Sequence, residues 1–285
     1  MPRQLRDMTV LITGASAGIG AALARQLHAH GARLVLSARR EDRLHQLNRE
    51  LGGQHLVVPA DVALPDHCAR LVDVAFSAFP RLDTLVLNAG YGDMRPVAET
   101  EPHHLQAIFA TNLLGTLEPI RLALPRLLAQ PPRDPPSDPT RAHLMIVSSA
   151  AARRGLPYFG AYSATKAAQL SIAEALRVEI RGRGIPVTTV HPVGTATEFF
   201  DVAQARGNRK MPPRVPGDIQ QSADQVAAAM VRAIRKPGTH GGEVWPFKPA
   251  RFALSLATLL PGFTDRIMAK ARGHIETAQN TTPQT

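Results

Sequence analysis

Short apolar runs alternate along the chain with segments whose apolar residues recur every three or four positions. Each run is rich in leucine or β-branched residues and is bounded by turn-forming residues, as expected of strands buried on both faces of a sheet. The runs are Thr9–Thr13, Arg33–Ser37, His55–Pro59, Thr84–Leu87, His143–Val147 and Val187–Val190. We predict that they form the strands of one parallel sheet.

The segments between these runs predict helices. Ile19, Leu23 and Leu27 form one apolar stripe, and similar stripes occur at 44–51, before the glycines at 52 and 53, and at 71–79. The residues 222–225 (Ser-Ala-Asp-Gln) fit a capping box that opens a helix from Ala223 to about Arg235. Strands that alternate with helices imply right-handed crossovers. We therefore predict an α/β fold with a doubly wound parallel sheet (Rossmann-like): a single domain with a core of about 8–248 and a C-terminal helical extension of about 249–285.

Two segments interrupt this pattern. The prolines of 130–141 (QPPRDPPSDPTR) remove backbone donors, so we expect a surface loop there, with a partner-binding arm as the alternative. The apolar segment 252–263 contains Pro261 and is too short to span a membrane. We expect a buried or lid helix, and peripheral contact with a membrane or an apolar partner is the alternative. The polar tail after Ile275 is expected to fray.

The composition is that of a soluble globular protein, with 44% hydrophobic and 20% charged residues among 285. A single cysteine, Cys68, excludes an internal disulfide and fits a reducing compartment. We expect it to be a core residue rather than a reactive thiol. The N-terminal segment does not have the layout of a signal peptide, and the expected location is cytoplasmic.

The chain carries a formal net charge of +10, which would attract polyanions. Its arginines are spread along the sequence, however, and the few aromatic residues are not interleaved with them. Nucleic-acid binding needs a coherent basic face or a stacking platform. We therefore expect no nucleic-acid partner.

A glycine-rich turn follows the first predicted strand and precedes the first helix. Its sequence, TGASAGIG at 13–20, places Gly14, Gly18 and Gly20 where the backbone can approach a pyrophosphate and where the positive end of a helix faces the anion. The strand before the turn and the helix after it supply the context that such a motif requires. The pattern predicts a nucleotide site.

The end of the second predicted strand indicates which nucleotide binds. An NAD site usually has an acidic residue there, whereas this strand is followed by Arg39 and Arg40, with Glu41 already in the next turn. A guanidinium group suits a 2′-phosphate. We therefore favour NADP(H) over NAD(H); the alternative is that both arginines simply begin a solvated helix.

Tyr162 and Lys166 stand four residues apart in GAYSATKAAQL, 160–170. On a helix this spacing places both side chains on one face, where they could share a cleft or lie as an ordinary surface pair. A nearby ammonium group favours a phenolate and would lower the tyrosine pKa toward the range useful for proton transfer.

Together with this pair, several motifs occur in the order and spacing of the classical short-chain dehydrogenases/reductases. They are TGASAGIG (13–20), LNAG (87–90), TNLLG (111–115), IVSS (146–149), YSATK (162–166) and HPVGTAT (191–197). The chain resembles that family from about Thr9 to Thr197. One departure is Val193 where the family usually has glycine, which here comes one place later as Gly194.

The resemblance implies a catalytic set of Asn112, Ser149, Tyr162 and Lys166, with Asn112 linking Lys166 to solvent through water and Ser149 holding the substrate oxygen. Ser148 is the weaker candidate for the serine. It also implies that the coenzyme contacts are Gly14, Ser16, Gly18, Ile19, Gly20, Arg39, Arg40, Asp61, Val62, Asn88, Ala89, Gly90, Tyr162, Lys166, Pro192, Thr195 and Thr197. No metal ion is expected. A homo-oligomer, dimer or tetramer, is expected through the helices that bear Asn112 and Tyr162.

The predicted function is that of an oxidoreductase that interconverts a ketone or aldehyde and an alcohol with NADP(H). In this architecture the substrate meets the segment after the sixth strand, here 197–219, which begins with Phe199, Phe200 and Val202 and continues into the basic run 206–210. The apolar start favours a hydrophobic substrate. The alternative is a non-catalytic nucleotide-sensing or scaffold protein, which would be expected to lose the tyrosine or the lysine.

Overall fold

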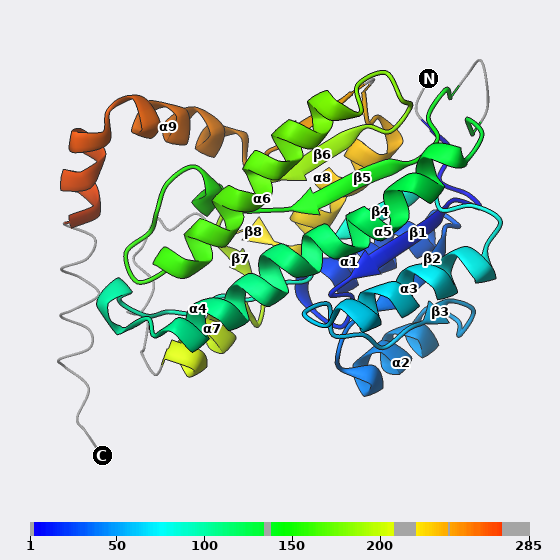
Figure 1. Cartoon of the computed structure of the whole chain (residues 1–285), viewed down its shortest axis with the longest axis horizontal. Helices are drawn as coiled ribbons and strands as arrows, with labels where there is room; N and C mark the ends of the chain where they lie inside the picture. The colour runs from blue at the N-terminus through cyan, green and yellow to red at the C-terminus, as the bar shows by residue number, and fades with distance from the viewer. Residues whose placement is uncertain (1–2, 134–137, 208–220, 239, 270–285) are drawn as a thin grey trace.

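The computed structural model describes residues 3–133, 138–207, 221–238 and 240–269 (Figure 1). Parallel strands form one sheet in the order β3-β2-β1-β4-β5-β6-β9. They are β1 (Thr9–Thr13), β2 (Arg33–Ser37), β3 (Leu56–Val57), β4 (Thr84–Leu87), β5 (His143–Val147), β6 (Val187–Val190) and β9 (Gly241–Val244). The strand order reverses between β1 and β4, so a crevice opens there at the carboxyl ends of the strands.

Helices cover both faces of the sheet (Figure 1). On one face pack α1 (Gly18–Ala29), α2 (Glu41–Glu50) and α8 (Ala223–Arg235); on the other pack α3 (Pro65–Ala78), α5 (Gly115–Ala129) and α6 (Gly160–Glu179). Alternate residues of each strand serve the two cores: Val10 and Ile12 face the first group and Leu11 faces the second. The predicted fold class, a doubly wound parallel sheet, is confirmed.

The described chain also contains elements that are not part of these two layers. They are η1 (Val97–Glu99), α4 (Pro102–Phe109), the π-helical turn η2 (Ala110–Leu114), η3 (Ala150–Ala152), α7 (Phe199–Gly207), α9 (Lys248–Leu259) and a small two-stranded sheet of β7 (Thr195–Ala196) and β8 (Gln221–Ser222). Most of them lie beyond the carboxyl ends of the main strands, where α7 and α9 stand over the crevice.

Five predicted strands have the boundaries expected from the sequence, and α8 begins with the predicted capping box. There, Ser222 Oγ accepts a hydrogen bond from the Gln225 amide at 3.1 Å, and Gln225 Oε1 accepts one from the Ser222 amide at 2.9 Å. The third strand is shorter than the predicted 55–59. The sequence pattern did not predict β9, because consecutive glycines are typical of a turn. The structure requires glycine at 241: its φ is 88°, and a Cβ there would lie 2.0 Å from the Val187 carbonyl oxygen.

The apolar segment 252–263 differs from the expectation of a buried helix. It is helical over most of its length, but Phe252 is 75% exposed and Leu259 is 76% exposed. One side of α9, with Ala250, Ala253 and Leu254, lines the crevice. Of the two predicted forms, a lid helix fits this segment better than a buried helix. A further helical stretch covers 261–269, and the rest of the extension lies outside the described residues. Within the described ranges, no helix is long and apolar enough to cross a bilayer.

The proline-rich segment is described only at its two ends. Arg133 pairs with buried Asp83 at 2.7 Å, and Asp138 pairs with Arg3 at 2.7 Å, so both ends are tied to the body of the protein. Residues 134–137 lie outside the described residues. Cys68 is fully buried, and burial raises the pKa of its thiol to about 11, which confirms it as a core residue.

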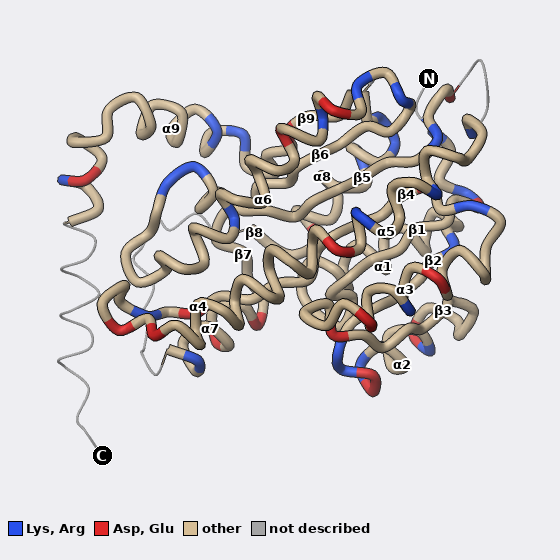
Figure 2. Tube along the Cα trace, in the orientation of Figure 1, with Lys and Arg blue, Asp and Glu red and all other residues tan. Residues whose placement is uncertain are grey.

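Basic and acidic residues are interspersed along the described chain rather than gathered by sign on one element (Figure 2). Ion pairs connect many of them, including Arg25 with Glu50, Arg126 with Asp73 and Arg121 with Glu118. The net positive charge is therefore distributed over the surface.

Candidate active site

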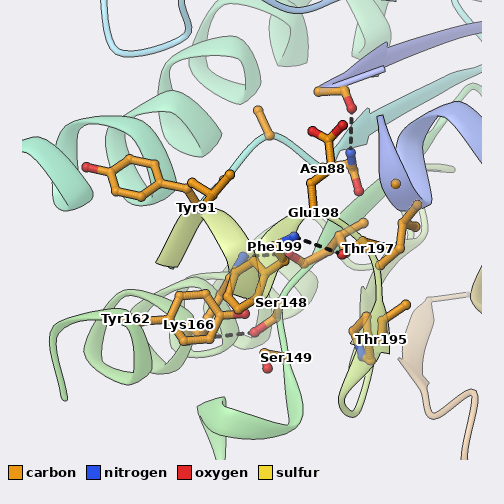
Figure 3. A pocket seen from close by; sticks show the side chains of 18 of the residues that line it. Asn88, Tyr91, Ser148, Ser149, Tyr162, Lys166, Thr195, Thr197, Glu198 and Phe199 are labelled. Atoms are coloured by element: carbon orange, nitrogen blue, oxygen red, sulfur yellow. Dashed lines mark hydrogen bonds between the residues drawn. The ribbon is translucent and has the colours of Figure 1, made fainter. Parts of the chain in front are cut away.

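A cavity of about 630 Å³ lies at the carboxyl ends of the strands. Its walls come from the turns that follow β1, β2, β4, β5 and β6 and from α6, α7 and α9. Segments far apart in the sequence therefore meet around one space, and Figure 3 shows side chains from several of them pointing into it. A volume of this size is typical of a site for a small molecule or a coenzyme.

The glycine turn at one end of the cavity is shaped for close approach of a ligand to the backbone. Gly14 and Gly18 have φ values of 68° and 55°, which glycine adopts without strain. A Cβ on Gly20 would lie 2.3 Å from the Gly14 carbonyl oxygen, so only glycine allows the first turn of α1 to pack there. The amino end of α1 adjoins the cavity, and its partial positive charge can attract an anion there.

Polar side chains from β1 and β4 hold this turn in place. Thr13 Oγ1 accepts hydrogen bonds from the backbone amides of Asn88 and Ala89 at 3.0 and 3.1 Å. Asn88 Nδ2 donates to the carbonyl oxygens of Thr13 and Gly14 at 3.0 and 3.2 Å. Asn88, which directly follows β4, thus fastens the glycine turn to the end of that strand.

Beside the glycine turn, two arginines stand next to acidic side chains. Arg40 Nη1 pairs with Glu198 at 2.9 Å, and its Nε and Nη2 donate to Ser16 Oγ at 3.3 and 3.2 Å. Arg43 pairs with the same Glu198. Arg39 lies 3.9 Å from Asp61, and the carboxylate of Asp61 accepts from the Ala63 amide at 3.0 Å. The neighbouring arginines hold the pKa of Glu198 below its usual range.

Ser149, Tyr162 and Lys166 meet on one wall of the cavity (Figure 3). Ser149 follows β5 and caps η3, where its Oγ accepts from the Ala151 amide at 3.1 Å. Tyr162 and Lys166 lie one turn apart in the first half of α6; the Tyr162 hydroxyl shares a hydrogen bond with Ser149, and Lys166 Nζ is 5.7 Å from the tyrosine ring centre. The end of β5 and the first half of α6 therefore bring the three groups together.

Burial dominates the ionisation of this pair. It raises the pKa of Tyr162 to about 12, although the hydrogen bond with Ser149 acts in the opposite direction, and it lowers the pKa of Lys166 to about 7. From the sequence we expect the Lys166 ammonium to lower the pKa of Tyr162. In the structure the pKa of Tyr162 is raised instead, because both groups are almost completely removed from water. Near neutral pH the phenol keeps its proton.

The neighbouring Ser148 has a different role from Ser149. Its Oγ donates to the Lys166 carbonyl at 2.9 Å and is buried against α6. This hydrogen bond ties the end of β5 to the turn of the helix that carries Lys166. Ser149 is the one whose hydroxyl reaches the tyrosine.

Asn112 lies behind the cavity rather than on its wall. It sits in the π-helical turn η2, where the widened backbone places a buried amide beside the loop after β4. Asn112 Oδ1 accepts from the Tyr91 amide at 3.0 Å, and its Nδ2 donates to the Tyr91 carbonyl at 3.0 Å and to Thr165 Oγ1 at 3.1 Å. The asparagine therefore couples η2 to α6 and to the cavity loop.

The other expected contact residues divide in a similar way. Gly20 packs under the glycine turn, away from the cavity wall. The remaining expected positions line it: Gly14, Ser16, Gly18, Ile19, Arg39, Arg40, Asp61, Val62, Asn88, Ala89, Gly90, Pro192, Thr195 and Thr197. Around the departure at Val193, Thr195 Oγ1 donates to the Val193 carbonyl at 2.8 Å, and Gln221 Oε1 accepts from the Val193 amide at 3.1 Å.

The part of the cavity beside Tyr162 is apolar. Tyr162 packs against Phe159 and Phe199, with ring centres 6.2 and 5.0 Å apart, and Phe199 contacts Phe200 at 5.3 Å. Leu156, Val202 and Leu254 complete this part of the wall. Tyr91 also lines the cavity, and the Arg206 guanidinium lies 4.0 Å from its ring centre. The rest of the basic run, 208–210, lies outside the described residues.

A family model described as short chain dehydrogenase matches residues 8–207. The chain belongs to the short-chain dehydrogenase family. The match covers the sheet from β1 to β6, α7 and the crevice walls other than the one from α9. The predicted family is confirmed.

Relatives of known sequence or structure agree with this assignment. Arabidopsis thaliana 11-beta-hydroxysteroid dehydrogenase 1A is 39% identical over 66% of this chain and 52% of its own, so the chain spans about half the length of that relative. A short chain dehydrogenase/reductase from Burkholderia phymatum, solved in complex with NAD, matches 92% of this chain and 96% of its own, with a TM-score of 0.77 at 22% identity. The alcohol dehydrogenase of Thermococcus sibiricus, complexed with 5-hydroxy-NADP, matches 84% of this chain and 96% of its own, with a TM-score of 0.69 at 25% identity.

Sequence reasoning missed three polar residues of this family member's site. Glu198 pairs with Arg40, Tyr91 lines the apolar end, and Gln169 accepts from Lys166 Nζ at 3.0 Å. Gln169 could have been predicted from the sequence, because it is an amide one helical turn after Lys166 in a largely apolar stretch. The contacts of Glu198 and Tyr91 depend on how distant segments meet, and no local pattern encodes them.

Proposed function

We propose that this protein is an NADP(H)-dependent oxidoreductase that interconverts a ketone or aldehyde and an alcohol, with a hydrophobic substrate. The observation that carries this proposal is the meeting of Ser149, Tyr162 and Lys166 on the wall of a cavity whose other end is the glycine turn. One cavity thus offers an anion-binding helix end and a proton donor. Membership of the short-chain dehydrogenase family supports it.

The residues present fit a dinucleotide. Gly20 leaves no room for a side chain, and Gly14 and Gly18 adopt backbone conformations that leave the turn open to a pyrophosphate. The amino end of α1 would hold the pyrophosphate, Asp61 and Val62 would contact the adenine, and Lys166 would contact the nicotinamide ribose. A bound nicotinamide coenzyme supplies or accepts the hydride.

The chain's own groups manage the proton and the substrate oxygen. Tyr162 is protonated at neutral pH and can donate to the oxygen of a carbonyl that is being reduced. Ser149 shares a hydrogen bond with Tyr162, so the same oxygen can be held by both hydroxyls as negative charge develops on it. In its charged form, Lys166 favours the phenolate that remains after proton transfer.

The preference for NADP(H) rests on Arg39 and Arg40, which line the crevice beside Ser16 at the end of β2. A guanidinium can hold two phosphate oxygens at once. Among the relatives, the Burkholderia protein was solved with NAD and the Thermococcus enzyme with an NADP derivative, so the family fold accommodates both kinds of coenzyme.

The proposed substrate is hydrophobic because aromatic and aliphatic side chains surround Tyr162. Phe159, Phe199 and Phe200 offer apolar surface, and Leu254 of α9 adds to it from above. The name of the Arabidopsis relative, a hydroxysteroid dehydrogenase, agrees with a bulky apolar alcohol or ketone.

We also propose a cytoplasmic location, as the single buried cysteine suggests, and assembly as a dimer or tetramer.

The second candidate function is a non-catalytic nucleotide sensor or scaffold on the same fold. Such a protein has no use for the hydrogen-bonded serine and tyrosine beside a buried lysine, and their intact arrangement favours the enzyme. The two functions predict different results with coenzyme: a sensor binds it without turnover.

The proposed function is tested by following NADPH absorbance at 340 nm while the protein is offered a panel of apolar ketones, aldehydes and 3-oxo lipids. We expect carbonyl-dependent loss of NADPH with at least one bulky apolar member of the panel, and slower loss with NADH. Tight NADPH binding with no turnover across the panel would favour the sensor.

A further inference from the structure

A buried glutamine lies between Lys166 and Asn112. Gln169 is one turn after Lys166 on α6 and is 1% exposed. Its Oε1 accepts from Lys166 Nζ at 3.0 Å, while its Nε2 donates to the Asn112 carbonyl at 2.6 Å and to Thr116 Oγ1 at 2.8 Å. The partners fix the orientation of this amide, because an ammonium can only donate and a carbonyl can only accept.

The backbone carbonyl of Asn112 is fully used by these contacts. It accepts from Gln169 Nε2 at 2.6 Å and from Thr116 Oγ1 at 2.8 Å, and a carbonyl oxygen has two lone pairs. The resemblance to the family implied that water links Asn112 to Lys166. In this protein the side chain of Gln169 connects the two residues directly, through hydrogen bonds to Lys166 Nζ and to the Asn112 carbonyl.

The same contact fixes the direction of the lysine. An ammonium has three protons, of which Lys166 donates one to the Val147 carbonyl at 2.9 Å and one to Gln169. The third is left for the cavity, whose wall Lys166 lines. Gly90 borders this space, and a Cβ there would be in ordinary van der Waals contact with Lys166 Nζ at 3.5 Å.

We propose that Gln169 is a positioning residue for catalysis. From its position between Lys166 and Asn112, it directs the Lys166 ammonium into the cavity and stabilises the charged form of this lysine. This inference rests on the proposed function, because it assigns Gln169 a role in the same site. Burial alone lowers the pKa of Lys166 to about 7, close to working pH, so an acceptor on Nζ affects the fraction that is charged.

The surroundings of Lys166 make this effect measurable. Among the described residues, the titratable side chain in contact with it is Tyr162, whose ring centre is 5.7 Å from Nζ. The segments packed around it from β5, from the loop after β4 and from η2 present backbone groups and the amide of Asn112. Tyr91, on the loop after β4, has its ring against Arg206. No charged side chain in this part of the structure contributes to the lowered pKa of Lys166.

The test compares Gln169→Leu, which removes the acceptor, with Gln169→Glu, which replaces it by a carboxylate. Gln106→Leu and Gln106→Glu are the matched controls, because Gln106 is exposed on α4 and does not line the cavity. For each protein, the dissociation constant of NADPH is measured by fluorescence titration from pH 5 to 10, and kcat/KM for carbonyl reduction is measured over the same range.

We expect the alkaline limb of both profiles to shift by about one pH unit in opposite directions. It moves to lower pH in Gln169→Leu, because the ammonium loses an acceptor, and to higher pH in Gln169→Glu, because a carboxylate favours the ammonium. The Gln106 variants keep the wild-type profile. A merely structural role would change affinity or stability without opposite shifts in pH.

Limbs that stay in place, or that move in the same direction in both variants, would overturn the inference. Thermal unfolding is recorded for every variant, and Gln169→Met provides a second protein without the amide where the leucine variant fails to fold. Failure of the proposed function has a distinct signature: wild-type protein would show no turnover, while the NADPH titrations would still report on Gln169.

Discussion

We expect single side chains at the end of the crevice beside the glycine turn to set the choice of coenzyme. Arg40 is held between Ser16 and Glu198, and Arg39 stands beside Asp61. A 2′-phosphate would therefore meet two guanidinium groups and would compete with Glu198 for Arg40.

Replacing both Arg39 and Arg40 by alanine should weaken NADPH binding by on the order of tenfold or more relative to NADH, because charge-assisted hydrogen bonds to the phosphate are lost. Dissociation constants for both coenzymes, measured by fluorescence titration, check this. Arg49→Ala, an exposed arginine at the end of α2, is the matched control. Equal losses for NADPH and NADH would contradict the 2′-phosphate assignment.

The catalytic candidates could be predicted because their spacing is local. Tyr162 and Lys166 are one helical turn apart, and Ser149 is 13 residues before Tyr162, between β5 and α6. Glu198 could not be predicted, because its contact with Arg40 joins residues 158 apart in the chain. The balance of burial against charge at Tyr162 also depends on packing that only the folded structure supplies.

Among the elements, β5 carries a buried titratable residue that is separate from the site. His143 is fully buried, its Nε2 lies 2.8 Å from Thr188 Oγ1, and burial lowers its pKa to about 3. In the unfolded chain the imidazole takes up a proton below about pH 6.5, whereas in the folded protein it does not. Stability is therefore lost as the pH falls below about 6.5.

Between pH 7 and pH 5 this single group should lower the free energy of unfolding by about 2 kcal/mol. His143→Gln keeps a partner for Thr188 and does not titrate. Urea unfolding of both proteins at the two pH values isolates the contribution as the difference in their pH dependence. The same loss in the variant would show that other groups cause it.

The elements also show where pattern reasoning succeeds and where it fails. Strands such as β4 and β5 are continuous apolar runs between turns, and burial on both faces requires that composition. By contrast, β9 has glycines where it meets β6. The helix α9 is rich in apolar residues, yet several of them, such as Phe252 and Leu259, are exposed. Tertiary contact decides both cases, and a local window does not contain it.

At the scale of the whole molecule, the exposed surfaces of η2 and α6 favour assembly. Leu114 and Val178 are more than half exposed on these helices, although both are apolar. Symmetric oligomers commonly bury such positions against a second copy. Light scattering on the purified chain should therefore give two or four times its mass of 30.7 kDa at micromolar concentration. A monomer under those conditions would contradict this expectation.

The central claim is that Tyr162 gives the proton to the substrate oxygen. Tyr162→Phe removes one hydroxyl and keeps the ring that packs between Phe159 and Phe199. The most direct measurement is the rate of NADPH oxidation by this variant with a carbonyl that the wild-type protein reduces, alongside the NADPH dissociation constant of both proteins. We predict a loss of at least two orders of magnitude in rate with coenzyme affinity retained. A variant that turns over at the wild-type rate would contradict the account.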